Sequence, residues 1–501
     1  MSPQSRTALL VALATFALAL ALRLTGIGGR EPWLDEVYSQ FAISREWYGL
    51  VADRIGRGHS PLYYALMKAF GIEGENIFAM RAASAAFDAG GAAILAGALT
   101  KYVNLRAGLF FGILYAGSPL AIDWAQNARP YGLLMLFTGI AVTGAMGLMA
   151  TLGRGADAPG VRRSMRLFGY GFSLASLTMT AGIFAFAVTA LLPFALPRFR
   201  ADRAFMARWK RAVKVPAIVA FLGYWAFSGP HIARQVEGYW ADKYNTLGIE
   251  GLSRLWQQVM IGDVVSVTFA QTGLSQGVLS WLIWTVSLAL FAFALRGALA
   301  SRARPALLAP LLLTVGYVLL LIAVSSWTSV LVSRYFLPAW ICFLALAASG
   351  MATFSTRWPW GWTVILPVLG IMIASGFNQA SMPDTPPRDR SLRPVAEIIA
   401  RVPPEKLRLL YDKLNDNRTT LILELYPMRY SRPELGRPDM NSFTRQRLED
   451  ALEQNRDVFS YMTDTGLADA LASGVAEPAC QHDFGDWVLA YWGTNPAACA
   501  P

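Results

Sequence analysis

Two adjacent carboxylates, Asp35 and Glu36, follow the first apolar stretch of this 501-residue chain and are the leading candidates for acid–base chemistry. The apolar residues that recur at helical spacing around them are Leu34, Val37, Tyr38 and Phe41. This spacing predicts an amphipathic helix along a membrane surface. Carboxylates close to a bilayer interface are costly unless they are used or paired, so both are candidate catalytic residues. The structural alternative is a solvated acidic first turn of a helix.

A second segment, which begins at His59, has the features of an anion site. Ser60 as N-cap and Pro61 at the first helical position predict the start of a helix. The free amide groups and positive dipole end of such a helix suit a phosphate. His59 stands directly before this helix as a candidate phosphate ligand, and Tyr63 and Tyr64 follow as candidate substrate-binding residues. The alternative for His59 is a purely structural histidine.

Three arginines, Arg81, Arg129 and Arg334, stand at the same-side ends of predicted membrane spans. Arginine suits a phosphate because its planar fork donates two parallel hydrogen bonds. Tyr335 follows Arg334 and joins the candidate phosphate-binding set, while Tyr131 follows the Ala-Arg-Pro sequence at Arg129 and is a candidate substrate-binding residue. Interfacial snorkelling is the alternative for each arginine alone. Their shared side with Asp35 favours a common site.

Taken in order, these motifs resemble GT-C fold glycosyltransferases. The motifs that carry the resemblance are Asp35-Glu36, His59-Ser60-Pro61-Leu62-Tyr63-Tyr64, Arg81, Ala128-Arg129-Pro130-Tyr131 and Arg334-Tyr335-Phe336-Leu337-Pro338. The similarity is spread over about residues 7–350. It is greatest to the bacterial RgtA/B/C/D-like and protein-mannosyltransferase-like group, which includes the lipid A aminoarabinose transferases. One departure is His59-Ser60-Pro61, where that group more usually has His-Pro-Pro or Lys-Pro-Pro.

The resemblance implies an enzyme that moves a sugar from a polyprenyl phosphate to a periplasmic glycan, glycolipid or protein. Asp35 would activate the acceptor as general base, and Glu36 would orient the acceptor or bind a metal. The basic residues would hold the donor phosphate. The sequence has no clustered metal-ligand pattern, so we expect no cofactor, although a divalent metal stays open. The alternative is a transporter or lipid flippase. Transporters usually show related halves, and the sequence has no such repeat.

The composition requires a membrane. Hydrophobic residues make up 54% of the chain and charged residues only 15%, against roughly 45–50% and ~25% in soluble domains. The net charge of +11 does not indicate nucleic-acid binding. Residues 1–378 carry 30 basic and 15 acidic residues, whereas residues 379–501 carry 14 and 18. The basic excess therefore lies in the apolar part, where it sets orientation.

Eleven membrane spans are predicted. They cover about residues 7–25, 79–100, 107–123, 131–151, 166–178, 180–197, 214–229, 276–295, 305–324, 335–353 and 358–378. The pair from 166 to 197 could instead be one broken helix. With the N-terminus in the cytoplasm, the cytoplasmic segments hold 18 basic residues against only Asp157 and Asp202. This asymmetry predicts a multi-pass protein of the bacterial inner membrane whose C-terminus is periplasmic.

Two domains follow: a GT-C-like transmembrane domain at 1–378 and a small periplasmic α/β domain at 379–501. The predicted strands of the second domain are Leu407–Tyr411, Thr420–Leu425 and Trp487–Tyr491, and its predicted helices are Arg393–Arg401 and Asn441–Asn455. Cys480 and Cys499 could form a disulfide if this domain faces an oxidising compartment. The alternative is two unpaired thiols.

The topology can be tested directly. The basic segments 153–166 and 198–214 should be cytoplasmic because positive charge is retained on that side, and the tail should be periplasmic. Reporter fusions at Arg163 and Asp416 should therefore give opposite signals. Matching signals from the two fusions would overturn the span count.

Overall fold

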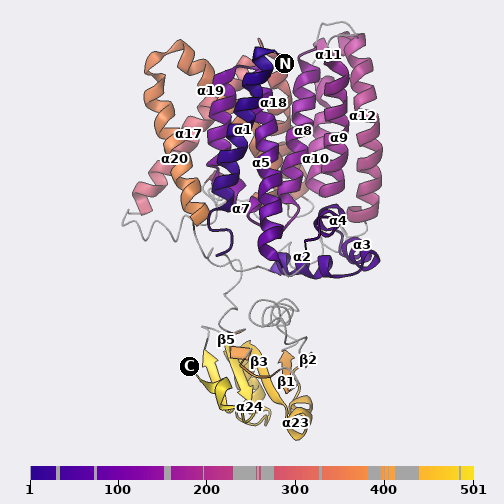
Figure 1. Cartoon of the computed structure of the whole chain (residues 1–501), viewed down its shortest axis with the longest axis vertical. Coiled ribbons are helices and arrows are strands. Elements are labelled where there is room, and N and C mark those ends of the chain that lie inside the picture. Colours follow the sequence, from indigo (N-terminus) through magenta and orange to yellow (C-terminus); the bar gives the residue numbers. More distant parts are fainter. Residues whose placement is uncertain are drawn as a thin grey trace. The chain divides into compact units, whose positions relative to one another are not determined.

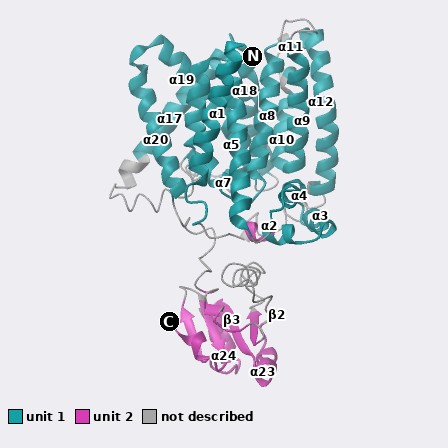
Figure 2. Ribbon diagram, viewed as in Figure 1, with its two compact units in different colours: residues 1–30, 39–386 teal, residues 31–38, 387–501 magenta. Residues whose placement is uncertain are grey.

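The computed structural model divides into two compact units, which are described separately. One unit consists of residues 1–30 and 39–386, and the other of residues 31–38 and 387–501 (Figure 2). The structure describes residues 2–29, 34–72, 76–151, 160–195, 197–229, 255–256, 259–260, 276–326, 330–381, 395, 398–399, 401–403, 406–411, 439–483 and 487–500.

The larger unit is a bundle of long helices (Figure 1). Its helices are α1 (Pro3–Leu24), α5 (Ile77–Tyr102), α6 (Leu105–Ala116), α8 (Tyr131–Met149), α9 (Val161–Thr178), α10 (Thr180–Ala190), α12 (Arg203–Gly223), α17 (Gln276–Ala300), α18 (Leu308–Ser325), α19 (Leu337–Arg357) and α20 (Trp362–Ser381). Shorter elements are α3 (Trp47–Gly56), α4 (Leu62–Ala69), α7 (Pro119–Ala125) and α11 (Pro197–Ala201). Helix α2 (Leu34–Ser44) is divided between the units, with residues 34–38 in the smaller unit and residues 39–44 in the larger one. Helices α3, α4 and α7 lie at the end of the bundle away from the N-terminus, which we call the α7 end (Figure 1).

The helices begin where the sequence supplies caps. Asn76, Asn104 and Asp202 each accept a hydrogen bond from a backbone amide of the first turn of the helix that follows. Such side-chain caps satisfy amide groups that have no partner within the helix. Among the described residues, seven helices are long and apolar enough to cross a membrane, or eight if a bent pair counts as one span. The chain is therefore a multi-span membrane protein.

The predicted span at 107–123 corresponds to two helices that are together apolar enough to cross a membrane. It is broken between α6 and α7, which meet at an angle of 60°. The pair predicted from 166 to 197 is two helices, α9 and α10, joined through the extended residue Met179. Helix α12 starts at Arg203, so much of the basic segment at 198–214 is helical rather than a loop.

Glycine lets α5 and α8 pack backbone against backbone. A Cβ atom added at Gly132 would lie 2.0 Å from the carbonyl oxygen of Ser84, and one at Gly91 would lie 2.3 Å from that of Met135. Small residues allow this close approach in membrane bundles, where association depends on packing rather than on the exclusion of water. The contact fixes α5 against the start of α8.

The smaller unit contains a five-stranded mixed sheet with strand order β2-β1-β3-β5-β4. Its elements are β1 (Leu407–Tyr411), β2 (Asp439–Ser442), α23 (Arg445–Glu453), β3 (Asp457–Thr463), α24 (Asp464–Ala472), β4 (Cys480–Asp483) and β5 (Trp487–Trp492). Strand β1 pairs in parallel with β2 and β3, and β5 pairs antiparallel with β3 and β4. The small C-terminal α/β domain is therefore confirmed.

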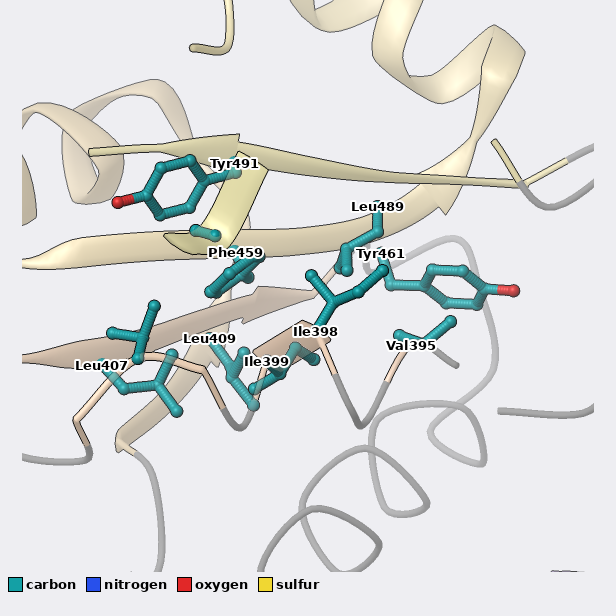
Figure 3. Close-up of a cluster of buried hydrophobic side chains, with 11 residues drawn as sticks. Val395, Ile398, Ile399, Leu407, Leu409, Phe459, Tyr461, Leu489 and Tyr491 are labelled. Atoms are coloured by element: carbon teal, nitrogen blue, oxygen red, sulfur yellow. The ribbon is translucent and has the colours of Figure 1, made fainter. Parts of the chain in front are cut away.

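Both faces of this sheet are covered. One hydrophobic cluster includes Ile398, Leu409, Phe459 and Leu489 (Figure 3). The other face packs against α23 and α24 through Leu448 and Leu467, among others. This burial gives the unit a hydrophobic core of its own, as expected for an independent domain.

The details of this unit correct the sequence analysis in one place. Residues 439–442 form β2, so the helix predicted from Asn441 starts only at Arg445. The predicted strand at 420–425 and most of the predicted helix at 393–401 lie outside the described residues. Cys480 and Cys499, left open as a disulfide or two thiols, form a disulfide in the structure.

Candidate active site

The candidate site is built around the break between α6 and α7. Ser118 caps α7 by accepting a hydrogen bond from the amide of Ala121. The indole Nε1 of Trp340 donates to the same hydroxyl oxygen at 2.8 Å. A break in a membrane helix needs such internal partners because lipid supplies none. The chain can therefore change direction at this point, and this change of direction places the residues that follow α7.

The turn after α7 is attached to the end of α1. Gln126 is buried, and its Nε2 donates to the carbonyl oxygens of Arg23 and Thr25 at 3.0 and 2.7 Å. A hydrogen bond in a buried, low-dielectric setting is stronger than the same bond in water. The turn that carries Arg129 is therefore held in place from its first residue.

Arg129 is buried and oriented by Tyr64. Its Nη1 donates to the Tyr64 hydroxyl oxygen at 3.0 Å. The ring of Tyr64 lies 4.9 Å from the guanidinium carbon of Arg54, within the range of a cation–π contact. Tyr64 thus stands between two cations. This arrangement brings together two residues that the sequence analysis had placed in separate phosphate-binding and substrate-binding groups.

Tyr63 supports the same turn through Ser84. The hydroxyl oxygens of Tyr63 and Ser84 lie 2.8 Å apart, and Ser84 Oγ donates to the carbonyl oxygen of Arg129 at 3.3 Å. Both side chains are buried. Tyr63 therefore orients the turn through these contacts; its predicted substrate contact stays a prediction.

A cluster of charges on α3 adds positive charge near Tyr64. Asp53 accepts hydrogen bonds from Arg54 and from Arg57, the latter at 3.1 Å. Burial alone would raise the pKa of Asp53, but the hydrogen bonds and charges of Arg54 and Arg57 outweigh burial and lower it below its ordinary value. Arg45 adds a third cation, with Nη1 3.8 Å from Oδ1 of Asp53, so the ionised carboxylate is favoured. The sequence analysis did not single out these three residues.

The second arginine, Arg334, lies in the short helix η4 (Ser333–Phe336) and is half-buried. Its guanidinium carbon is 5.8 Å from the ring centre of Trp124 and 5.8 Å from that of Tyr335. The Tyr131 ring centre lies 4.7 Å from that of Trp124. Trp124 on α7 therefore connects Arg334 with the residue that starts α8, so both arginines belong to the α7 end of the bundle.

Arg81 and His59 have different surroundings. Arg81 is buried, and its Nη1 donates to the carbonyl oxygen of Ile27 at 3.0 Å. This contact fixes α5 to the chain that leaves α1. His59 is exposed on the connection between α3 and α4, and its amide donates to the carbonyl oxygen of Arg54. Roles for these two residues in phosphate binding stay predictions.

The two carboxylates lie on the first turn of α2, where Asp35 is half-buried and Glu36 is buried. The helix predicted around them is present. The predicted helix after Ser60 is also present, but it starts at Leu62 and is only eight residues long. The Ser60 hydroxyl accepts from the amide of Leu62 and donates to the carbonyl of Leu177.

A third carboxylate, Asp123 on α7, was missed by the sequence analysis. It is buried and accepts a hydrogen bond from Nε2 of Gln379 at 3.3 Å. Nδ2 of Asn127 donates to its backbone carbonyl oxygen at 2.5 Å. An acidic residue at the end of a predicted span was the available signal. In the described part of the chain, no group of three or more His, Cys, Asp or Glu side chains could hold a metal.

The bundle and tail together have the fold of a known membrane enzyme class. The crystal structure of ArnT from Cupriavidus metallidurans in the apo state matches with a TM-score of 0.62 and 15% identity, over 98% of each chain. ArnT from the same organism bound to undecaprenyl phosphate matches with a TM-score of 0.60 and 15% identity, over 96% of this chain and 97% of that chain. The chain therefore has the GT-C membrane glycosyltransferase fold, as the resemblance predicted.

Other comparisons add little. The oligosaccharyltransferase of Archaeoglobus fulgidus, tethered with an acceptor peptide, matches with a TM-score of 0.48 and 12% identity, over 90% of this chain and 69% of that chain. This weaker likeness supports no conclusion. No family model and no curated protein matches the sequence.

Replacing Tyr64 with Phe tests how Arg129 is held. The change keeps the ring but removes the hydroxyl that accepts from the buried guanidinium. A hydrogen bond to a charged group contributes about 1.5–3 kcal/mol, so the free energy of unfolding in mixed micelles should fall by about that amount. Tyr48→Phe is the matched control because Tyr48 is 87% exposed. Equal stability of the two variants would show that the hydroxyl does not hold Arg129.

Proposed function

We propose that this protein is an integral membrane glycosyltransferase that moves a sugar from a polyprenyl phosphate to an acceptor in the periplasm. The acceptor classes are a lipopolysaccharide or other envelope glycan, a glycolipid, or a protein. The alternative from another class, a transporter or flippase, lacks a specific structural observation in its favour.

The proposal depends most on one observation. A chain that matches ArnT over nearly its whole length places two arginines, Arg129 and Arg334, at the α7 end of its bundle. One of the matching ArnT structures is bound to undecaprenyl phosphate. Arginine is suited to a lipid phosphate because its donors pair with two phosphate oxygens at once. Arg129 is buried and Arg334 is half-buried.

The proposed reaction is a single displacement at the anomeric carbon. Asp35 accepts the proton of the acceptor hydroxyl as the acceptor oxygen bonds to that carbon. The bond between the carbon and the phosphate oxygen breaks, and polyprenyl phosphate leaves. Arg129 and Arg334 stabilise the negative charge that grows on the phosphate. Glu36 orients the acceptor. Asp35 is assigned this role because it follows the first span, on the first turn of α2, and because the family resemblance implies it.

The direct test uses purified protein in detergent with a polyprenyl-phosphate-linked sugar and candidate acceptors. A glycosyltransferase should release polyprenyl phosphate in this closed mixture, which has no transmembrane gradient. A transporter or flippase should leave the donor intact. Mass spectrometry of envelope glycolipids from a deletion strain would supply the acceptor for this assay.

Replacing Arg334 with Lys should reduce turnover by about tenfold or more. Lysine keeps the positive charge but cannot present a planar fork to the phosphate, and each such charge-assisted bond contributes on the order of 1.5–3 kcal/mol. The matched control is Arg166→Lys, because Arg166 is exposed on α9. If Arg334→Lys has wild-type turnover and donor affinity, Arg334 only anchors the chain at the membrane interface.

Replacing Asp35 with Asn should slow turnover by about 10²–10⁴-fold, the usual scale for general acid–base catalysis. Asparagine has almost the same shape and can bond the acceptor, but it does not take up a proton at neutral pH. Donor binding and thermal stability should therefore stay near wild type. Turnover should be measured at matched expression.

Glu36→Gln is the companion variant and should have the milder effect if Glu36 only orients the acceptor. Turnover of Asp35→Asn above about a tenth of wild type would remove Asp35 as the base. The assignment would then pass to Glu36.

A further inference from the structure

An ion pair is buried within the bundle, in residues to which the proposed function gives no role. Arg23, in the last turn of α1, donates from Nε to Oδ2 of Asp88 on α5 at 2.5 Å. The hydroxyl of Tyr115 on α6 donates to Oδ1 of the same carboxylate at 2.7 Å. Arg23, Asp88 and Tyr115 are 0%, 1% and 0% exposed. Ionisable residues inside a membrane protein are costly and generally have a function.

The side chain of Arg23 holds the end of α6. Its Nη1 donates to the carbonyl oxygen of Ala116 at 3.4 Å, and its Nη2 donates to that of Tyr115 at 3.4 Å. These are the last two residues of α6, and terminal carbonyl groups of a helix need partners from outside it. The carbonyl oxygen of Tyr115 also accepts from the backbone amide of Ser118 at 3.2 Å, so Arg23 adds a second donor there. A cation at the C-terminus of a helix is also favoured by the helix dipole. Arg23 therefore caps the helix immediately before the break.

The backbone of Arg23 holds the far end of the same segment. Its carbonyl oxygen accepts the hydrogen bond from Gln126, directly after α7. Arg23 thus contacts the chain on both sides of α7. Its side chain bonds the end of α6, which precedes α7, and its main chain bonds Gln126, which follows α7. Asp88 supplies the negative charge that allows a guanidinium to lie in this place without solvent.

We propose that Arg23 is a positioning residue that sets the course of residues 117–130 and thereby the position of Arg129. Asp88 accepts from Nε of this guanidinium, while Nη1 donates both to Ala19 of α1 at 3.1 Å and to α6, and Nη2 donates to α6. A guanidinium reaches the carboxylate and the two carbonyl groups from three separate nitrogen atoms in a fixed plane, whereas lysine donates from a single nitrogen. The expected effect of Arg23 on binding of the donor lipid rests on the proposed function. The expected effect on the conformation of residues 117–130 does not.

The first experiment measures hydrogen–deuterium exchange of peptides from residues 117–130. In Arg23→Lys the ammonium group still neutralises Asp88, but it cannot also bond both carbonyl groups of α6. Exchange in 117–130 should rise about tenfold or more, the scale expected when a hydrogen bond to a charged group is lost. Peptides from α19 should keep wild-type exchange. The matched control is Arg208→Lys, another buried arginine, whose Nη2 donates to the carbonyl of Thr151.

A second variant, Arg23→Met with Asp88→Asn, removes both charges together and so leaves no unpaired charge in the bundle. Hydrogen–deuterium exchange of residues 117–130 should also rise in this variant, because the guanidinium that bonds the end of α6 is absent. Wild-type exchange at 117–130 in both variants would overturn the proposal and reduce Arg23 to an anchor between α1 and α5. An equal rise across the whole bundle would overturn it too, because that result indicates a general loss of stability.

Binding of undecaprenyl phosphate, measured by native mass spectrometry, separates this inference from the proposed function. Both Arg23 variants should bind the lipid about tenfold or more weakly than wild type if Arg129 is displaced. If exchange rises as expected while the wild-type protein fails to bind the lipid, the positioning role stands and the proposed function fails. If wild type binds the lipid and both variants bind it equally well, Arg23 does not position Arg129.

Discussion

The site depends on the requirement that a broken helix inside a membrane satisfies its own backbone polar groups. The chain breaks after Ala116, and the exposed groups of the break are met by protein side chains. Arg23 bonds the last carbonyl groups of α6, while Ser118 caps the first turn of α7 and is itself bonded by Trp340. With these partners, α7 can run at an angle to α6. This angle sets the positions of Trp124 and of the turn that contains Arg129.

This requirement also explains why the polar residues gather at one end of the bundle. Asp123 is bonded by Gln379 of α20, and Gln126 is bonded to the end of α1. The glycines follow the same pattern: a Cβ at Gly117 would lie 2.8 Å from the backbone of Met372, and one at Gly376 would lie 2.5 Å from the carbonyl oxygen of Gly117. Backbone contact between α20 and the break leaves no space for side chains at these positions.

The sequence predicted the parts of the fold that depend on local pattern. Apolar runs and basic segments indicated the long helices, and short stretches rich in apolar residues indicated the strands that begin at Leu407 and Trp487. The break at Gly117 was not predicted because hydropathy averages over it, although Gly117, Ser118 and Pro119 are local signals for the end of one helix and the start of the next. Motif order drew attention to Arg129 and Arg334, which the structure places at the same end. It could not reveal that Tyr64 bonds Arg129, because that contact joins residues 65 positions apart.

The partners of the broken segment come from distant parts of the chain, and this has a consequence for biosynthesis. Ser118 meets Trp340 across 222 residues, and Asp123 meets Gln379 across 256. A ribosome therefore delivers α7 long before α19 and α20 exist. During that interval, the insertion machinery must accommodate a bent segment whose buried carboxylate and hydroxyl have not yet met these partners. Among the described spans α20 is the last to enter the membrane, so the hydrogen bonds at the α7 end of the bundle are complete only after it has arrived.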